Sequence, residues 1–132
     1  MPESGRQLVH EEGVQLIREL TDTLHPLLTK MRSSKTIFVA ALNGASAGGG
    51  LGLALACDVR VASSSAKMAA SYSGIGLSPD GGTTWLLPRL VGEQSARKFF
   101  LENQVWNAEE AHYLGAIDEL VSDEELIPLS LI

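Results

Sequence analysis

Apolar residues in the first third of the chain recur with the period of a helix, and a short unbroken apolar run follows them. Leucine and methionine recur every three or four residues between Glu11 and Met31, which is the spacing of an amphipathic helix. Pro26 falls inside this pattern, so we expect a kink or two shorter helices there. Residues 36–43 (TIFVAALN) are almost wholly apolar and include β-branched residues, which predicts a buried strand of a parallel sheet.

The middle of the chain has the order of a β-α-β unit. After the predicted strand come a glycine-rich loop (NGASAGGG), a helical stretch (LGLALAC) and a segment with strand alternation (DVRVAS). Residues 66–70 are a candidate for one more short strand. This order predicts an α/β fold with parallel neighbouring strands.

The last third of the chain predicts helices that are separated by glycines. They are residues 83–90, residues 93–101 and the stretch between Asn107 and Gly115. Asn107 stands three residues before Glu110, which is the capping-box pattern of a helix start. Residues 116–121 are a candidate last strand, and a further helix is expected to begin within residues 123–126.

Composition and charge limit the classes of function. A chain of 132 residues with 45% hydrophobic content is expected to form at most one folded domain. The net charge of −6 argues against nucleic acid or an anionic membrane as a partner. Cys57, the lone cysteine, excludes an intramolecular disulfide and is expected to be a buried structural thiol. No metal-site spacing, signal peptide or membrane-length apolar run occurs, so a cytoplasmic protein without a metal is expected.

The glycine-rich loop at residues 43–50 is the first candidate for chemistry. Its successive glycines precede a predicted helix, so they place backbone N–H groups at a helix N-terminus, where an anion is favoured. Such a loop suits phosphate binding or an oxyanion hole, but the GxxxxGK[ST] pattern of a phosphate loop is missing. The glycines also suit tight packing of helix on strand, and the loop alone leaves these alternatives open.

A carboxylate between glycines is the second candidate. Residues 74–89 (GIGLSPDGGTTWLLPR) are mainly apolar except where Asp80 stands in a Pro-Asp-Gly-Gly sequence. A turn beside a helix N-cap explains this pattern, and so does a catalytic carboxylate at a helix start. The histidines at positions 10, 25 and 112 lie in predicted helices away from both motifs and are interpreted as surface or packing residues.

Three segments taken together resemble a known family. They are NGASAGGGLGLALACDVRVASSSAKM, IGLSPDGGTTWLLPRLVG and NAEEAHYLGAIDELV. Their order and spacing are similar to those of the crotonase superfamily, the enoyl-CoA hydratase/isomerase family, over residues 35–126. The resemblance implies an α/β fold that is part of a crotonase-like β-β-α superhelix. It also implies an acyl-CoA thioester as substrate, with coenzyme A entering as part of that substrate and no other cofactor.

The resemblance also implies roles for individual residues. The Gly49 N–H corresponds to an oxyanion-hole donor, with Gly48 and Gly50 shaping the loop. Asp80 corresponds to the aspartate that some members use as acid and base, which points to the isomerases with an aspartate base. Tyr72 and Trp85 are candidate walls of the acyl pocket, although for Tyr72 a half-buried structural role is the simpler interpretation.

The residues at two positions disfavour the hydration of a double bond. The glutamates of the hydratases correspond to Gly52 and Tyr72, neither of which can transfer a proton in that way. Double-bond migration in an enoyl-CoA of fatty acid metabolism is therefore the preferred activity. The alternatives are hydratase or aryl-CoA dehalogenase chemistry, and a non-catalytic fragment or assembly module.

Family members are roughly twice as long, so the resemblance implies a partial domain. We expect residues 1–34 to form an N-terminal helical segment and residues 35–126 to form the family-matching core of a single domain spanning 1–132. No counterpart of the family's first half, which carries the second oxyanion donor, or of its C-terminal helices is found. The strand at residues 36–43 is therefore expected at an exposed sheet edge. The resemblance also implies a homo-oligomer, a trimer or hexamer.

Overall fold

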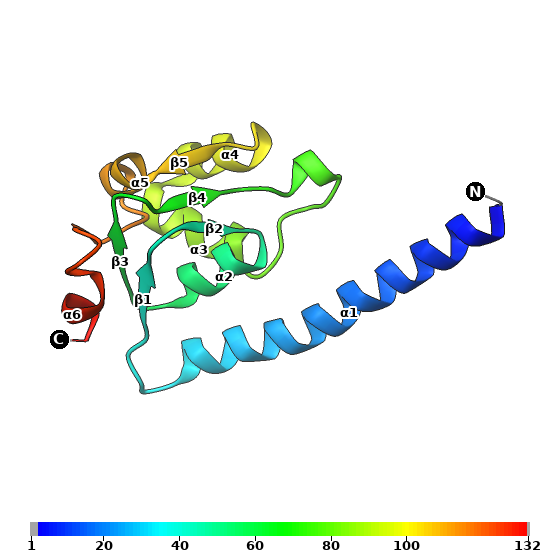
Figure 1. Ribbon diagram of the computed structural model, residues 1–132, viewed down its shortest axis with the longest axis horizontal. Helices are drawn as coiled ribbons and strands as arrows, with labels where there is room; N and C mark the ends of the chain where they lie inside the picture. The colour runs from blue at the N-terminus through cyan, green and yellow to red at the C-terminus, as the bar shows by residue number, and fades with distance from the viewer. Residues whose placement is uncertain (1–2, 132) are drawn as a thin grey trace.

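The structure, a computed structural model, describes residues 3–131 and their side chains from residue 11 onward. Its elements are α1 (Glu3–Ser33), β1 (Val39–Leu42), β2 (Ala45–Ala47), α2 (Gly49–Ala56), β3 (Val59–Ser63), β4 (Lys67–Ala69), a 3₁₀ turn (Ser73–Ile75), α3 (Thr83–Val91), α4 (Glu93–Leu101), β5 (Val105–Asn107), α5 (Ala108–Leu114), β6 (Glu119–Val121) and α6 (Leu126–Ser130). Figure 1 shows the strands and the later helices gathered in one body, from which the N-terminal part of α1 extends.

Two three-stranded sheets make up the β-structure. β1, β3 and β6 lie in that order and are all parallel, so β1, α2 and β3 form the predicted β-α-β unit. In the second sheet β2 runs parallel to β4, and β5 runs antiparallel to β4. β1 has one neighbour in its sheet, which confirms the predicted edge strand. The prediction that this strand is buried is wrong, because Val39 is exposed and the other residues of β1 are half-buried. β2 and β5 were not predicted, because β2 falls within the glycine-rich loop and β5 ends at Asn107, the predicted helix start.

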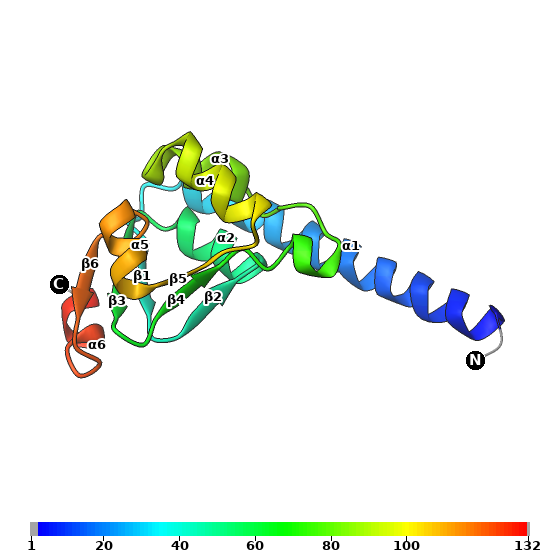
Figure 2. The ribbon, with the colours of Figure 1, turned by 90° about the horizontal axis from the view of Figure 1, so that it is seen from above.

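Helix α1 runs through Pro26 without interruption, so the prediction of two shorter helices is wrong. Proline removes a hydrogen bond to the carbonyl four residues earlier, which here belongs to Asp22. Asp22 is exposed, so water can satisfy that carbonyl and the helix tolerates the proline. The C-terminal half of α1 lies against the body through Leu28 and Met31, which are buried, whereas the N-terminal half extends past it (Figure 2).

The core lies between α2 to α5 and the strands. Phe99 of α4 and Trp106 of β5 are buried, and their ring centroids are 4.2 Å apart. Asn107 is confirmed as the N-cap of α5, because its side chain accepts a hydrogen bond of 2.8 Å from the Glu110 N–H, which is one of the two bonds of the predicted capping box. Gly115 ends α5 at φ 92°, the left-handed conformation expected after a helix.

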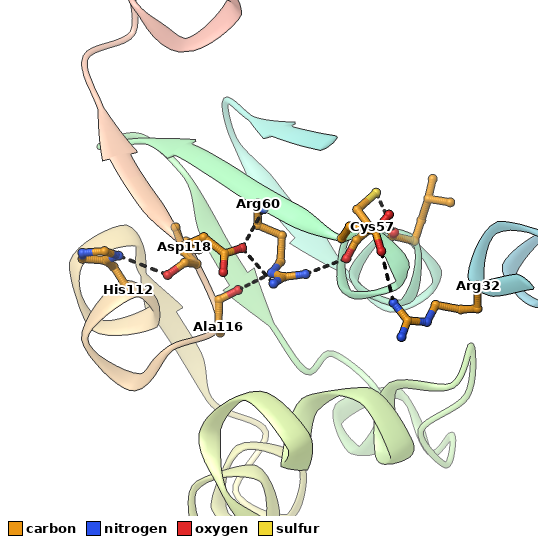
Figure 3. Close-up of polar contacts among 9 residues, drawn as sticks. Arg32, Cys57, Arg60, His112, Ala116 and Asp118 are labelled. Carbon is orange, nitrogen blue, oxygen red and sulfur yellow. Dashed lines mark hydrogen bonds and ion pairs between the residues drawn. The ribbon is translucent and has the colours of Figure 1, made fainter. Parts of the chain in front are cut away.

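A buried arginine joins elements that are far apart in the sequence. Arg60 of β3 is 3% exposed, and its guanidinium donates to the carbonyls of Cys57 and Ala116 and pairs with Asp118 at 2.8 Å (Figure 3). The Asp118 carboxylate also accepts a bond of 2.8 Å from the Arg60 backbone N–H. Cys57 is buried as predicted, and burial raises the pKa of its thiol. This network ties the end of α2 to the segment before β6.

Candidate active site

The turn that carries Asp80 depends on its two glycines. Gly81 and Gly82 both have positive φ, at 58° and 72°, a conformation that residues with a Cβ rarely adopt. The turn is closed by Thr83, which is fully buried and donates to the Asp80 carbonyl through its N–H at 3.0 Å and its Oγ1 at 2.7 Å. The backbone around Asp80 is therefore held in place, and α3 begins directly after it.

The Asp80 carboxylate takes no part in closing this turn. The N-cap of α3 is Gly82, and no side chain caps the helix, so the alternative of Asp80 as the N-cap is wrong. Asp80 is half-buried, and its Oδ1 atom is buried without a hydrogen-bond partner among the described residues. A buried carboxylate oxygen without a partner is costly, so it calls for an explanation other than folding.

The glycine loop ends in the helix start that the sequence predicted. Gly48, at φ 52°, is the N-cap of α2, and Gly49 is the first residue of the helix. The first hydrogen bond of α2 runs from the Gly52 N–H to the Gly48 carbonyl at 3.1 Å. Because N–H groups of a first helical turn have no intrahelical acceptor, the Gly49 N–H is available to a ligand at the positive end of the helix.

Close packing of two glycines brings the loop and the turn together. A Cβ atom placed on Gly52 would lie 2.8 Å from the Gly81 carbonyl oxygen, closer than real Cβ contacts. The absence of a side chain therefore lets the Asp80 turn rest against α2, one helical turn from Gly49. A glutamate at position 52 would not fit this arrangement without a shift of the backbone.

Asp80, Gly48 and Gly49 line one cavity of about 480 Å³ between α1, the start of α2 and residues 71–80. Most of its walls are apolar. The apolar residues are Ile17, Leu20, Leu24, Leu27, Ile75 and Leu77. A cavity with apolar walls, one carboxylate and free N–H groups suits a ligand that is largely apolar and carries a carbonyl group.

Tyr72 lies on the wall of the same cavity and is 4% exposed, more buried than the half-buried position that was predicted. Its hydroxyl reaches the Asp80 carbonyl at 3.5 Å, a long contact. Burial raises the pKa of the Tyr72 phenol, and a hydrogen bond with Thr83 acts in the opposite direction. The neutral hydroxyl therefore persists in the folded protein well into alkaline pH.

The remaining candidates lie elsewhere. Trp85 lines a second cavity, of about 630 Å³, which Asp80 also borders but which Gly49 does not. Gly50 lines neither cavity and stays a predicted loop-shaping residue.

His25 of α1 lines the second cavity, so its interpretation as a residue away from the motifs is wrong. The helical period predicts the helix α1 but does not predict that α1 packs beside the Asp80 turn.

The other two histidines have no place in these cavities. His112 Nδ1 lies 3.1 Å from the Ile117 carbonyl oxygen, which agrees with a packing role (Figure 3). The side chain of His10 lies outside the described residues.

Neither a metal site nor a membrane-crossing helix is present in the described part of the chain. Within residues 11–131, whose side chains the structure describes, no three side chains among histidine, cysteine, aspartate and glutamate come together as a metal site. Among the helices of residues 3–131, none combines the length and the apolar character that a membrane crossing requires.

Comparison with known proteins gives consistent matches. The sequence model of the enoyl-CoA hydratase/isomerase family matches residues 6–130. A probable enoyl-CoA hydratase of Rhodobacter capsulatus is 44% identical over 112 residues, which cover 85% of this chain and 44% of that protein. The 1,2-epoxyphenylacetyl-CoA isomerase of Escherichia coli is 40% identical over 102 residues, which cover 77% of this chain and 39% of that protein.

Solved structures match in the same way. The crystal structure of a putative enoyl-CoA hydratase/isomerase from Mycobacterium abscessus superposes with a TM-score of 0.86 at 31% identity. The superposition covers 95% of this chain and 48% of that one, so the chain spans about half the length of the proteins it matches. The matched stretch includes both the glycine loop and the Asp80 turn. The chain belongs to the enoyl-CoA hydratase/isomerase family of the crotonase superfamily, and its α/β architecture is part of the crotonase fold.

Proposed function

We propose that this chain carries an enoyl-CoA isomerase site, in which Asp80 moves a proton between two carbons of an acyl thioester while the Gly49 N–H holds its carbonyl oxygen. The observation that carries the proposal is the buried Oδ1 atom of Asp80, which has no partner among the described residues and borders the cavity that Gly49 lines. An acyl-CoA thioester is the substrate class that the names of the relatives support.

The chemistry needs one carboxylate and one or more N–H donors. Polarisation of the thioester carbonyl by the Gly49 N–H makes the protons on the α-carbon more acidic. Asp80 removes one of them from a 3-enoyl-CoA, and the electron pair spreads from the α-carbon to the γ-carbon and the carbonyl oxygen. The protonated Asp80 then returns its proton to the γ-carbon, which moves the double bond to the 2,3-position. Every proton and electron pair is accounted for without a further reactant.

Packing at position 52 favours migration of a double bond over addition of water. Hydration by two carboxylates needs a second acid or base, and Gly52 leaves no room for one at that place, because a Cβ would meet the Gly81 carbonyl oxygen at 2.8 Å. Tyr72 occupies the other position and holds its proton more tightly than a free tyrosine, because burial raises its pKa. A single carboxylate is enough for the transfer of one proton between two carbons.

The proposal is tested with 3-hexenoyl-CoA and with the chain, its Asp80→Asn variant and its Asp80→Glu variant at equal concentration. We expect 2-hexenoyl-CoA from the parent chain, a loss of at least about 100-fold in the Asp80→Asn variant and partial activity in the Asp80→Glu variant. Equal rates in the parent and the Asp80→Asn variant would remove Asp80 as the base. A 3-hydroxyacyl product would favour hydration, and no product from any chain would favour the non-catalytic alternative.

A further inference from the structure

Leu24 of α1 is the side chain that contacts both chemical elements of the site. Its Cδ2 atom lies 3.4 Å from the position that a Cβ atom would take on Gly49, and 3.9 Å from the same position on Gly81. Leu24 is half-buried, whereas Leu20, one turn earlier on the helix, is 59% exposed. α1 therefore covers the space between the Gly49 N–H and the Asp80 turn with the side chain of Leu24.

Leu24 and Leu28 stand on opposite sides of the Asp80 turn. Leu24 lines the cavity of about 480 Å³ that contains Gly49, and Leu28 lines the cavity of about 630 Å³ that contains Trp85. Asp80 borders both cavities. Because Leu28 Cδ1 also lies 3.8 Å from the Cβ position of Gly81, these two leucines of α1 mark the boundary between the two spaces.

A bound thioester would place its α-carbon under Leu24. Its carbonyl oxygen must lie within about 3 Å of the Gly49 N–H, and its α-carbon must lie within reach of the Asp80 carboxylate. The α-carbon is bonded to the carbonyl carbon, so it lies between these two groups. A substituent on that carbon that points toward α1 meets the Leu24 side chain.

We propose that Leu24 is a specificity-determining residue, which admits straight-chain enoyl groups and rejects those with a methyl branch on the α-carbon. This inference rests on the proposed function and adds to it the class of acyl group. One methyl group in an apolar pocket changes the specificity constant by about 10- to 200-fold, which is the range expected here.

The test compares Leu24→Ala with Leu16→Ala on 3-butenoyl-CoA and 2-methyl-3-butenoyl-CoA. Leu16 is an exposed leucine of the same helix that lines neither cavity, so its variant is the matched control. We expect Leu24→Ala to raise the ratio of kcat/KM for the branched over the straight substrate by at least about 10-fold. We expect the ratio in Leu16→Ala to stay within about twofold of the parent. Equal ratios in both variants would overturn the role of Leu24.

A second variant and a binding measurement keep the result decisive. Leu24→Val removes one methylene group and replaces Leu24→Ala in the test if circular dichroism shows that Leu24→Ala is unfolded. It should shift the ratio of kcat/KM in the same direction by a smaller factor.

Binding of butanoyl-CoA and 2-methylpropanoyl-CoA is measured by calorimetry on the same proteins. Binding with an unchanged preference contradicts the role of Leu24 alone, whereas a parent chain that binds neither thioester contradicts the proposed function as well.

Discussion

Arg60 and Asp80 are both charged side chains set among apolar residues, and the structure treats them in opposite ways. Arg60 is 3% exposed and has acceptors in the Cys57 carbonyl, the Ala116 carbonyl and the Asp118 carboxylate. Asp80 has one carboxylate oxygen that is buried and without a partner among the described residues. The chain thus provides acceptors for the guanidinium of Arg60 but, among the described residues, no hydrogen-bond partner for the Oδ1 atom of Asp80.

The difference separates a group that holds the fold from a group that is available for chemistry. The partners of Arg60 come from the end of α2 and from the segment before β6, so each bond fixes the position of one element relative to another (Figure 3). Around Asp80 the fold is held by hydrogen bonds between its backbone carbonyl and Thr83, and the Oδ1 atom of its carboxylate has no partner among the described residues. A buried polar atom that has no partner in the fold is a candidate for a functional role.

Replacing Arg60 should have the largest effect on stability. Arg60→Met leaves two buried carbonyls without their donor and removes the ion pair with Asp118, whose carboxylate keeps its bond from the backbone N–H of residue 60. We expect a loss of about 2–5 kcal/mol in the free energy of unfolding. Urea denaturation measures it. Arg97→Met is the control, because Arg97 and Glu93 form an exposed pair at 3.2 Å that should be worth less than about 1 kcal/mol. Similar losses in both variants would contradict the structural role of Arg60.

Filling the contact between α2 and the Asp80 turn should have the next largest effect. Gly52→Ala places a Cβ 2.8 Å from the Gly81 carbonyl oxygen, and we expect a loss of about 1–3 kcal/mol from overpacking. Gly50→Ala is the matched control in the same helix, where a Cβ meets nothing within 4 Å and alanine should stabilise by up to about 1 kcal/mol. Equal changes in thermal midpoint would mean that the close approach is not required.

A smaller effect concerns Tyr72 and pH. Burial raises its pKa in the folded protein, so below about pH 10 both states carry the neutral phenol and its contribution is fully present. Above that pH the unfolded state loses its proton first, so stability falls as the pH rises toward the folded pKa. We expect Tyr72→Phe to remove this alkaline loss. Tyr113→Phe, at an 89% exposed position, should not change it, and a pH dependence that is the same in both variants would contradict this account.

Replacing Asp80 should have the smallest effect on stability. Asparagine has nearly the same shape and carries no charge, so Asp80→Asn should change the free energy of unfolding by less than about 1 kcal/mol in either direction. Urea denaturation of the two proteins checks this. A loss above about 2 kcal/mol would show that the carboxylate has a partner that holds the fold, and the contrast with Arg60 would then fail.

The sequence predicted most of the fold because its signals are local. The N-cap at Asn107, the helix end at Gly92 and the strand β1 each depend on residues within a few positions of one another. The three-residue strands β2 and β5 escaped prediction because their hydrogen bonds are made with β4, outside the local pattern. The uninterrupted course of α1 through Pro26 depends on the exposure of one carbonyl, which the pattern does not show.

The site was predicted in part, and the resemblance supplied most of that part. Asp80 and Gly49 were singled out from a turn and a glycine loop, and the structure brings them to one cavity. The contact of Gly52 with Gly81 and the place of Leu24 were not foreseen, because they join residues from separate elements. For the same reason the pairing of Arg60 with Asp118, 58 positions apart, had no signal in the sequence.

The central claim, that Asp80 is the base acting on a thioester held by the Gly49 N–H, is tested most directly by removal of a deuteron from the α-carbon. The parent chain and its Asp80→Asn variant are incubated with 3-butenoyl-CoA that is deuterated at the α-carbon, and loss of deuterium from that carbon is followed by NMR. The account predicts loss of an α-deuteron with the parent chain and a rate at least about 100-fold lower in the variant. Loss of the α-deuteron at equal rates with both proteins would contradict it.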